Sequence, residues 1–292
     1  MCANSEDISG SEMRTAYRVA QELLKDRLEM VDKDAYKQIK DVQGDDLIVV
    51  DGQYDFIGNV LAASGIPFRQ VGSVDVETIN FRSDQTVFIN CPGVISSAGL
   101  AKLHEFVTGG GFLFTTDWAL RNVLEPAFPG YVRYNNRRTG DEVVRVEFPS
   151  SDDPFLKLLI SAQDDPQWWL ESSSYPIEII DEKRVSVMVS SKEIGKKYGA
   201  SAVFVAFDHG NGKVYHMISH FYLQRSETRT QRHMKPGADY LDEKGIPAAL
   251  RAKYAAMGIG SSKLSDVESA FTSTAMMNKV LFDRKKSDER KK

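Results

Sequence analysis

Three residues with catalytic chemistry each follow a short apolar run in this sequence. Cys91 follows Val87 to Asn90, Asp117 follows Phe112 to Thr116, and His220 follows the run that begins at Val214. If the runs are parallel strands, their carboxyl ends share one edge of a sheet, where ligands of such sheets gather. A carboxylate beside an imidazole can act as an acid–base pair, and a thiol can act as a nucleophile. Asp117, His220 and Cys91 are therefore the candidate catalytic residues.

The same edge collects further polar groups that suit a small polar ligand. Asp51 follows the first apolar run, and Asn90 and Gly93 flank Cys91. We predict that Asp51, Asn90, Gly93, Asp117 and His220 bind such a ligand. Simpler roles remain open, since Asp117 precedes a helical pattern that it could cap and Cys91 could be a small buried residue. No Cys-x-x-Cys pair occurs, so no metal and no cofactor are predicted.

The positions of these residues depend on alternating strands and helices. Apolar runs at 47–50, 87–90, 112–115 and 214–219 are separated by helical stripes, of which Leu100, Leu103, Phe106 and Val107 form one. Runs of this kind are buried on both faces, so we predict one mostly parallel sheet covered by helices. Residues 131–148 alternate around 137–141, which predicts a β-hairpin with a basic tip.

Three motifs resemble the class I glutamine amidotransferase-like superfamily, in particular its trehalose-utilisation-type and β-galactosidase-associated branches. They are Phe88 to Gly93, Leu103 to Gly111, and Gly210 to Phe221. The resemblance implies an α/β fold with a three-layer, flavodoxin-like domain at 46–222, to which β-hairpins are added. A helical N-terminal extension would occupy 1–45, and a loop with a helical C-terminal extension would occupy 223–292.

The sequence departs from the active members of that superfamily at their nucleophile. Their strand-to-helix turn carries a cysteine between glycines, whereas this turn reads Thr115-Thr116-Asp117-Trp118-Ala119, and the acid expected two residues after the late histidine is missing. A carboxylate cannot run the same acyl-transfer cycle. The sequence therefore favours a non-catalytic binding or assembly module, with a hydrolase that uses Asp117 and His220 on a small polar or carbohydrate-like substrate as the alternative.

Composition limits the partners and the compartment. The net charge of −4, from 37 basic and 41 acidic residues, does not favour nucleic-acid binding, and no apolar run reaches membrane-spanning length. Two cysteines and no secretory signal indicate a cytoplasmic protein. The apolar stripes of the predicted helices at 11–30 and 264–282 would either engage a protein partner or a second copy, or cover the protein's own sheet.

Overall fold

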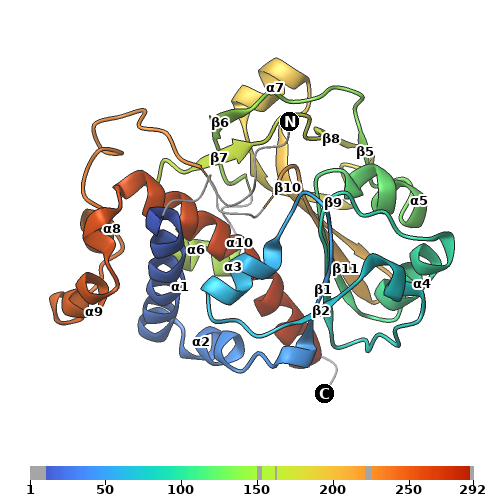
Figure 1. The fold of residues 1–292 in the computed structure, drawn as a ribbon, viewed down its shortest axis with the longest axis horizontal. Helices are drawn as coiled ribbons and strands as arrows, with labels where there is room; N and C mark the ends of the chain where they lie inside the picture. The colour runs from blue at the N-terminus through green and yellow to red at the C-terminus, as the bar shows by residue number, and fades with distance from the viewer. Residues whose placement is uncertain (1–10, 150–152, 162, 221–224, 290–292) are drawn as a thin grey trace.

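A mixed β-sheet with helices on both faces forms the core of the protein (Figure 1). The computed structural model describes residues 11–149, 153–161, 163–220 and 225–289. Within them the sheet has nine strands, in the order β2-β1-β3-β4-β11-β10-β8-β5, with β9 also paired to β10. The strands β2, β1, β3, β4 and β11 run parallel, and the others pair antiparallel. The prediction that 47–50, 87–90, 112–115 and 214–219 share one mostly parallel sheet is confirmed.

The strands have the following bounds: β1 Leu47–Val50, β2 Arg69–Val71, β3 Thr86–Ile89, β4 Phe112–Thr116, β5 Val132–Tyr134, β6 Glu142–Arg145, β7 Gln167–Leu170, β8 Ile177–Ile179, β9 Val185–Ser190, β10 Ala202–His209 and β11 Gly212–Met217. The α-helices are α1 Ser11–Val31, α2 Lys33–Lys40, α3 Ile57–Ala63, α4 Ser97–Thr108, α5 Glu125–Ala127, α6 Pro154–Leu159, α7 Lys192–Tyr198, α8 Ala238–Glu243, α9 Arg251–Ala256 and α10 Leu264–Glu289. Short helical turns lie at η1 Gly44–Asp46, η2 Ser73–Glu77, η3 Leu120–Leu124, η4 Ala248–Leu250 and η5 Ile259–Ser261.

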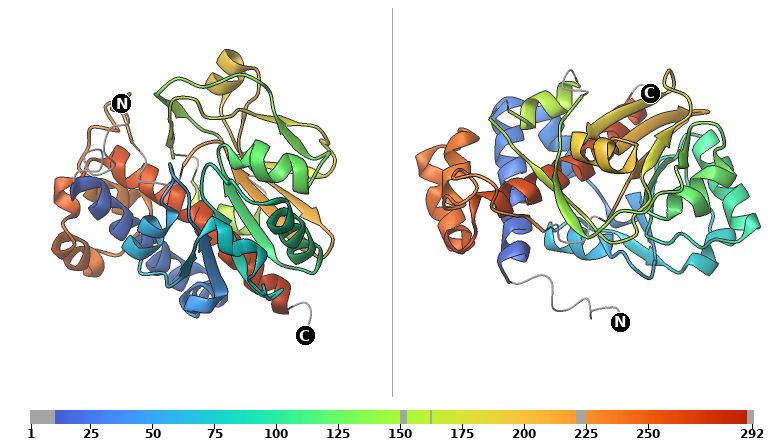
Figure 2. Two further views of the ribbon diagram at one scale, coloured as in Figure 1. Left: turned by 45° about the vertical axis from the view of Figure 1, so that its right-hand side comes forward. Right: turned by 90° about the horizontal axis from the view of Figure 1, so that it is seen from above.

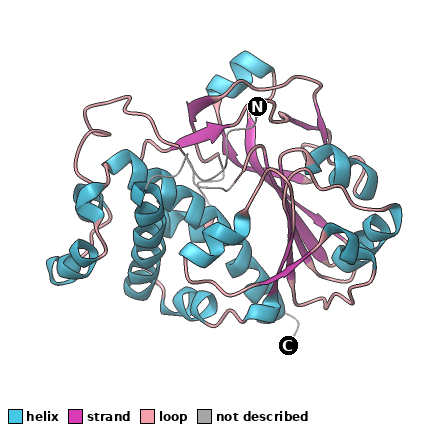
Figure 3. Cartoon of the chain, in the orientation of Figure 1, coloured by secondary structure: helices cyan, strands magenta, loops and turns pink. Residues whose placement is uncertain are grey.

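The helices form a layer on each face of the sheet. Figure 3 shows the strands between two groups of helices, with α4 and α5 on one side and α1, α3 and α10 on the other. All residues of β1, β3 and β4 are buried, as expected for strands covered on both faces. None of the described helices is long and apolar enough to cross a membrane.

The predicted hairpin at 131–148 is wrong. Residues 131–148 do not form a hairpin, because β5 pairs with β8 in the main sheet while β6 pairs with β7 in a separate two-stranded sheet. Turn residues between two apolar runs do not decide whether those runs pair with each other. Within the charged stretch 31–44 lies α2, whose first turn is capped by the Asp32 carboxylate.

The C-terminal helix α10 is buried in its own chain. It lies beside α1 and also contacts α2, α6 and α8, and Figure 2 shows it as a long red helix that passes behind the sheet. The side chains of Val267, Phe271, Met277 and Leu281 are at most 2% exposed. The apolar side chains of α10 therefore pack in the protein's own core. Of the two alternatives left open by the sequence, this is the one in which the helix covers its own sheet and does not engage a partner.

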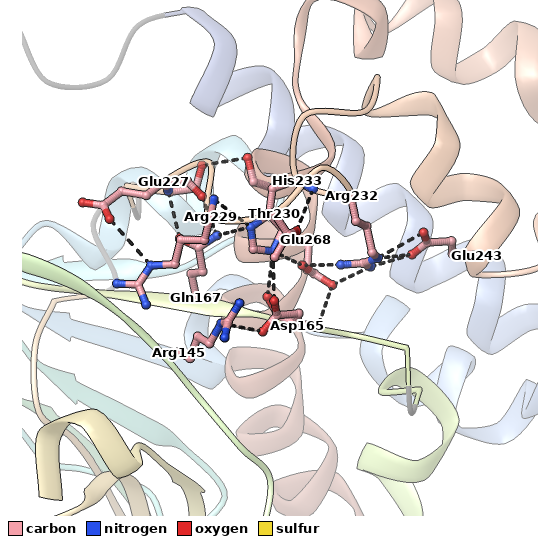
Figure 4. A network of polar contacts seen from close by, with 12 residues as sticks. Arg145, Asp165, Gln167, Glu227, Arg229, Thr230, Arg232, His233, Glu243 and Glu268 are labelled. Carbon is pink, nitrogen blue, oxygen red and sulfur yellow. Dashed lines mark hydrogen bonds and ion pairs between the residues drawn. The ribbon is translucent and has the colours of Figure 1, made fainter. Parts of the chain in front are cut away.

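A buried polar network joins α10 to the loop that precedes it and to the start of β7 (Figure 4). Arg232 donates two hydrogen bonds to the Glu268 carboxylate, at 2.8 and 3.1 Å, and also binds Glu243. The backbone N–H of Asp165 donates to Glu268 at 3.1 Å. Glu268 is therefore tied to this network, and helix α10 begins at Leu264, where the predicted helix at 264–282 begins.

Glu268 should make stability depend on pH near neutrality. Burial penalises its charged form more than Arg232 favours it, and raises its pKa from 4.5 to about 7. A carboxyl whose folded pKa is raised contributes stability that is complete below pH 4.5 and is lost as pH rises through the folded value. Relative to Glu268→Gln, the wild type should therefore lose on the order of 3 kcal/mol of unfolding free energy between those pKa values.

Urea unfolding at several pH values between mildly acidic and mildly basic conditions measures this difference. The exposed Glu182→Gln variant is the matched control, and its pH dependence should equal that of the wild type. Parallel curves for wild type and Glu268→Gln would contradict the assignment.

Candidate functional site

The polypeptide reverses direction sharply at Asp117, directly after β4. Asp117 has a φ of 44°, in the left-handed region that a non-glycine residue adopts at a cost. Its backbone N–H donates to the Met217 carbonyl at 2.9 Å, which fixes the turn against β11. A strained strand-to-helix turn of this kind presents its side chain at the carboxyl edge of the sheet.

The Asp117 side chain does not cap the following helix, so that interpretation is wrong. Among the described residues, its carboxylate accepts from the Tyr175 backbone N–H at 2.8 Å and from Ser174 Oγ at 3.4 Å. Burial raises the pKa of Asp117 above its usual range, although His220 opposes the shift. The turn directs this carboxylate into the protein rather than toward the helix.

His220 lies between two carboxylates. Its Nε2 is 3.4 Å from Asp117 Oδ2, and its Nδ1 is 2.9 Å from Glu171 Oε2. Burial alone lowers the pKa of His220, but the contacts with Asp117, Cys91 and Glu171 outweigh burial and raise its pKa well above 6.5. The imidazole of His220 therefore stands as a cation between acids, and Asp117 and His220 meet as predicted.

Glu171 is the residue that sequence reasoning missed. It follows β7, about fifty residues from His220 in sequence, and it supplies the acidic partner that is absent two positions after the histidine. The acid is recognisable only when β7 and the end of β11 are known to meet. The one feature of the sequence that could have suggested Glu171 as a site residue is its position directly after an apolar run.

Cys91 completes the buried group. Its Sγ lies 3.9 Å from Asp117 Oδ2, and the residue is 1% exposed. Burial raises the pKa of its thiol to about 11, so the thiol is protonated at neutral pH and is a poor nucleophile in this environment. Its backbone N–H donates to Thr116 Oγ1 at 3.1 Å, and Thr116 Oγ1 in turn donates to Asp55 Oδ2 at 2.7 Å.

Of the predicted ligand-binding residues, Asp51 and Asn90 lie in a neighbouring pocket. This pocket, of about 260 Å³, opens where the chain order reverses between β1 and β3, which is where sheets of this type bind ligands. It is lined by Val49, Asp51, Gly52, Asp55, Phe56, Gly58, Asn59, Gln70 and Asn90. Asp55 connects the pocket to the buried group, because it lines the pocket and accepts a hydrogen bond from Thr116 Oγ1. Burial raises its pKa, and the charge of His220 opposes that shift.

Gly93 and His216 have structural roles. The Gly93 N–H donates to the Asn90 carbonyl at 3.0 Å, and a side chain at Gly93 would collide with Ala119. The buried His216 bonds Thr115 Oγ1 at 2.8 Å, and burial lowers its pKa to about 3.

An aromatic series leads from the surface toward Asp117. Tyr54 is 43% exposed and lies edge-on to Trp118 at 5.3 Å, and Trp118 stacks on Tyr175 at 5.6 Å between ring centroids. Tyr175 also stacks on Tyr134 at 3.8 Å. Aromatic rings with polar tips provide flat apolar surface beside hydrogen-bonding groups, a combination that suits sugar-like molecules.

One group of residues within the described ranges has the donor atoms to share a metal ion. The ligand atoms of Cys91, Asp117 and His220 all lie within 4.8 Å of one another. No ligand spacing in the sequence pointed to this trio, because its members follow three different strands.

Comparisons with known proteins find distant structural neighbours only. No protein-family model matches the sequence, and no curated protein matches it. The solved structures similar to this chain include a cytoplasmic protein of Salmonella typhimurium, with 13% identity, a TM-score of 0.43 and coverage of 60% of this chain and 88% of that one. A ThuA-like protein of Bacteroides uniformis has 12% identity, a TM-score of 0.43 and coverage of 59% and 80%.

A third neighbour is an exo-β-1,4-mannosidase of an Opitutaceae bacterium, with 9% identity and a TM-score of 0.42. The match covers 74% of this chain but 35% of the mannosidase. At these scores the neighbours carry no argument about this protein, and its function is argued from its own residues.

Proposed function

We propose that the protein is a hydrolase for a small, uncharged, hydroxyl-rich substrate. The observation that carries the proposal is the orientation of Asp117, whose carboxylate is held on a strained turn and faces His220 and Cys91 instead of capping its helix. Burying ionisable groups together is costly, and such groups are concentrated at functional sites. Asp117 and His220 would activate the attacking water, directly or through a cation held between them.

The pocket between β1 and β3 supports the substrate class. Its polar side chains are the carboxylates of Asp51 and Asp55 and the amides of Asn59, Gln70 and Asn90, and the lining contains no lysine or arginine. Carboxylates accept hydrogen bonds from hydroxyl groups and repel anions, so a phosphorylated or acidic ligand is disfavoured. The order of the parallel strands also supports the flavodoxin-like classification, in which ligands bind at this switch point.

A larger cavity, of about 390 Å³, does not compete for this role. It lies at the opposite edge of the sheet, beside Phe112 and Gly212, which begin β4 and β11. Its Lys279 is bonded to Asp153 and Asp283, at 2.9 and 2.5 Å. Its charges are therefore largely satisfied within the protein.

Turnover tests the hydrolase proposal. The probes are p-nitrophenyl glucoside, galactoside and mannoside, together with p-nitrophenyl acetate. If Asp117 and His220 act at the reacting bond as proposed, Asp117→Asn and His220→Gln should each reduce kcat/KM by about 10²–10⁴-fold. The control Asp208→Asn changes an exposed aspartate at the other edge and should leave turnover unchanged. Equal release of nitrophenol by wild type and both site variants would refute hydrolysis.

A binding module without chemistry is the second candidate, because Cys91, Asp117 and His220 are each at most 4% exposed. Whether the protein is a hydrolase or a binding module, free glucose, galactose or mannose should raise its melting temperature, whereas glucose 6-phosphate should not. The shift should shrink in an Asn59→Ala, Gln70→Ala variant and persist in Gln163→Ala, which changes an exposed amide outside the pocket. A shift without turnover would establish the binding module.

Glutamine hydrolysis is not expected. The elbow position carries Asp117, and the nearby Cys91 has a thiol pKa of about 11. Ammonia release from glutamine should therefore not exceed that of an Asp117→Ala, Cys91→Ala variant. A higher rate in the wild type would contradict the assignment.

A further inference from the structure

Three different donor atoms converge on one buried point at the carboxyl edge of the sheet. They are Cys91 Sγ, Asp117 Oδ2 and His220 Nε2, which follow β3, β4 and β11. Oδ2 lies 3.9 Å from Sγ and 3.4 Å from Nε2. A thiol, a carboxylate and an imidazole at these separations form a ligand set rather than a hydrophobic contact.

The separations are close to those that a tetrahedral zinc ion imposes. With bonds of about 2.3 Å to sulfur and about 2.0–2.2 Å to nitrogen and oxygen, neighbouring donors lie roughly 3.4–3.6 Å apart. The 3.4 Å separation meets this value, and the 3.9 Å contact requires a shift of a few tenths of an ångström. The third pair, Cys91 Sγ and the His220 nitrogen, lies within 4.8 Å and has to close further around the ion. We propose that Cys91, Asp117 and His220 bind a Zn²⁺ ion and leave its fourth position open.

The surrounding residues orient the three ligands as metal sites require. Glu171 Oε2 is 2.9 Å from His220 Nδ1, so it can hold the ring with Nε2 facing the ion, as second carboxylates do around zinc-bound histidines. The Tyr175 N–H and the Ser174 hydroxyl fix the Asp117 carboxylate. Thr116 accepts from the Cys91 N–H and so anchors the loop that carries the thiol.

The ligand set also selects the ion. Magnesium and calcium prefer oxygen donors. Of the three ligands here, only the carboxylate of Asp117 supplies oxygen. Zinc accepts sulfur, nitrogen and oxygen together. Its binding would displace the protons that Cys91 and His220 hold in the metal-free protein, and the resulting thiolate with the carboxylate would balance its charge. Three protein ligands with an open position are typical of catalytic zinc rather than structural zinc.

The catalytic part of this inference rests on the proposed hydrolase. A zinc ion held by Cys91, Asp117 and His220 would bind the attacking water at its open fourth position, so that Asp117 and His220 would act as metal ligands. The proposal that these residues bind zinc rests on the positions of the three donor atoms and requires no substrate. Zinc and turnover can therefore be measured separately.

The test uses the full-length protein without an affinity tag, stripped with a chelator and dialysed against Zn²⁺ or Mg²⁺. Elemental analysis should find about one zinc ion per chain and no retained magnesium. Zinc should also raise the melting temperature of the stripped protein, because it binds the folded state. Cys91→Ala and His220→Gln should each lose the bound zinc, whereas Cys2→Ala and His104→Gln should keep it.

Cobalt substitution provides a measurement that needs no variant. Co²⁺ bound by Cys91 should show a thiolate-to-cobalt charge-transfer band, which Zn²⁺ then removes. Zinc that stays bound in Cys91→Ala, or cobalt that binds without the band, would overturn the site. Zinc binding without turnover would keep the metal site and reject the hydrolase, whereas turnover by zinc-free protein would keep the hydrolase and reject a catalytic role for the zinc ion.

Discussion

Ending the chain after Gly260 should prevent the protein from folding. This truncation removes α10, whose fully or nearly fully buried apolar side chains are Leu264, Val267, Phe271, Met276, Met277, Val280 and Leu281. Burial of seven such side chains is worth roughly 10–20 kcal/mol before entropy is subtracted. A typical domain is stable by about 5–15 kcal/mol, so the remaining chain cannot compensate for the loss.

Circular dichroism and soluble yield measure the outcome of the truncation, and a chain that ends after Glu289 is its control. A finer comparison uses Phe271→Ala, which should cost about 3–5 kcal/mol, and Phe282→Ala, which should cost less because Phe282 is only partly buried. A truncated protein that stays folded and monomeric, but loses an association that the full chain shows, would restore the assembly interpretation.

Replacing Arg232 with methionine should destabilise the protein by about 3–5 kcal/mol. The guanidinium binds Glu268, whose side chain is 1% exposed, and Glu243, whose side chain is 18% exposed. Methionine fills similar space but leaves a buried carboxylate without its cation. The unpaired acid is the main cost, because without the guanidinium Glu268 must either stay charged out of water or take up a proton.

Urea unfolding of single and double variants separates this cause from lost packing. Arg232→Met with Glu268→Leu should be more stable than Arg232→Met alone, because the unpaired buried carboxyl group is gone. The control Arg133→Met breaks an exposed pair with Glu178 and should have a much smaller effect. If the double variant is no more stable than Arg232→Met, the pairing does not explain the loss.

The sequence by itself determined the parallel core and the edge where polar residues gather. Apolar runs at β1, β3, β4 and β11 are long enough to cross a sheet and too apolar to face water, so their burial follows from composition. Cys91, Asp117 and His220 follow three of these runs, and parallel strands bring their carboxyl ends together. The encounter of Asp117 with His220 was therefore predictable before the structure was known.

Tertiary structure alone decided the partners of these residues. Glu171 reaches His220 because β7 packs near the end of β11, and no local pattern reports the packing of segments so distant in sequence. The Asp117 carboxylate turned away from its helix because the Tyr175 N–H offered a buried donor, whereas sequence preference counts only neighbouring amides. The apolar stripe of α10 fits an assembly surface and a core helix equally well. Only its packing against α1 showed that it is buried in the protein's own core.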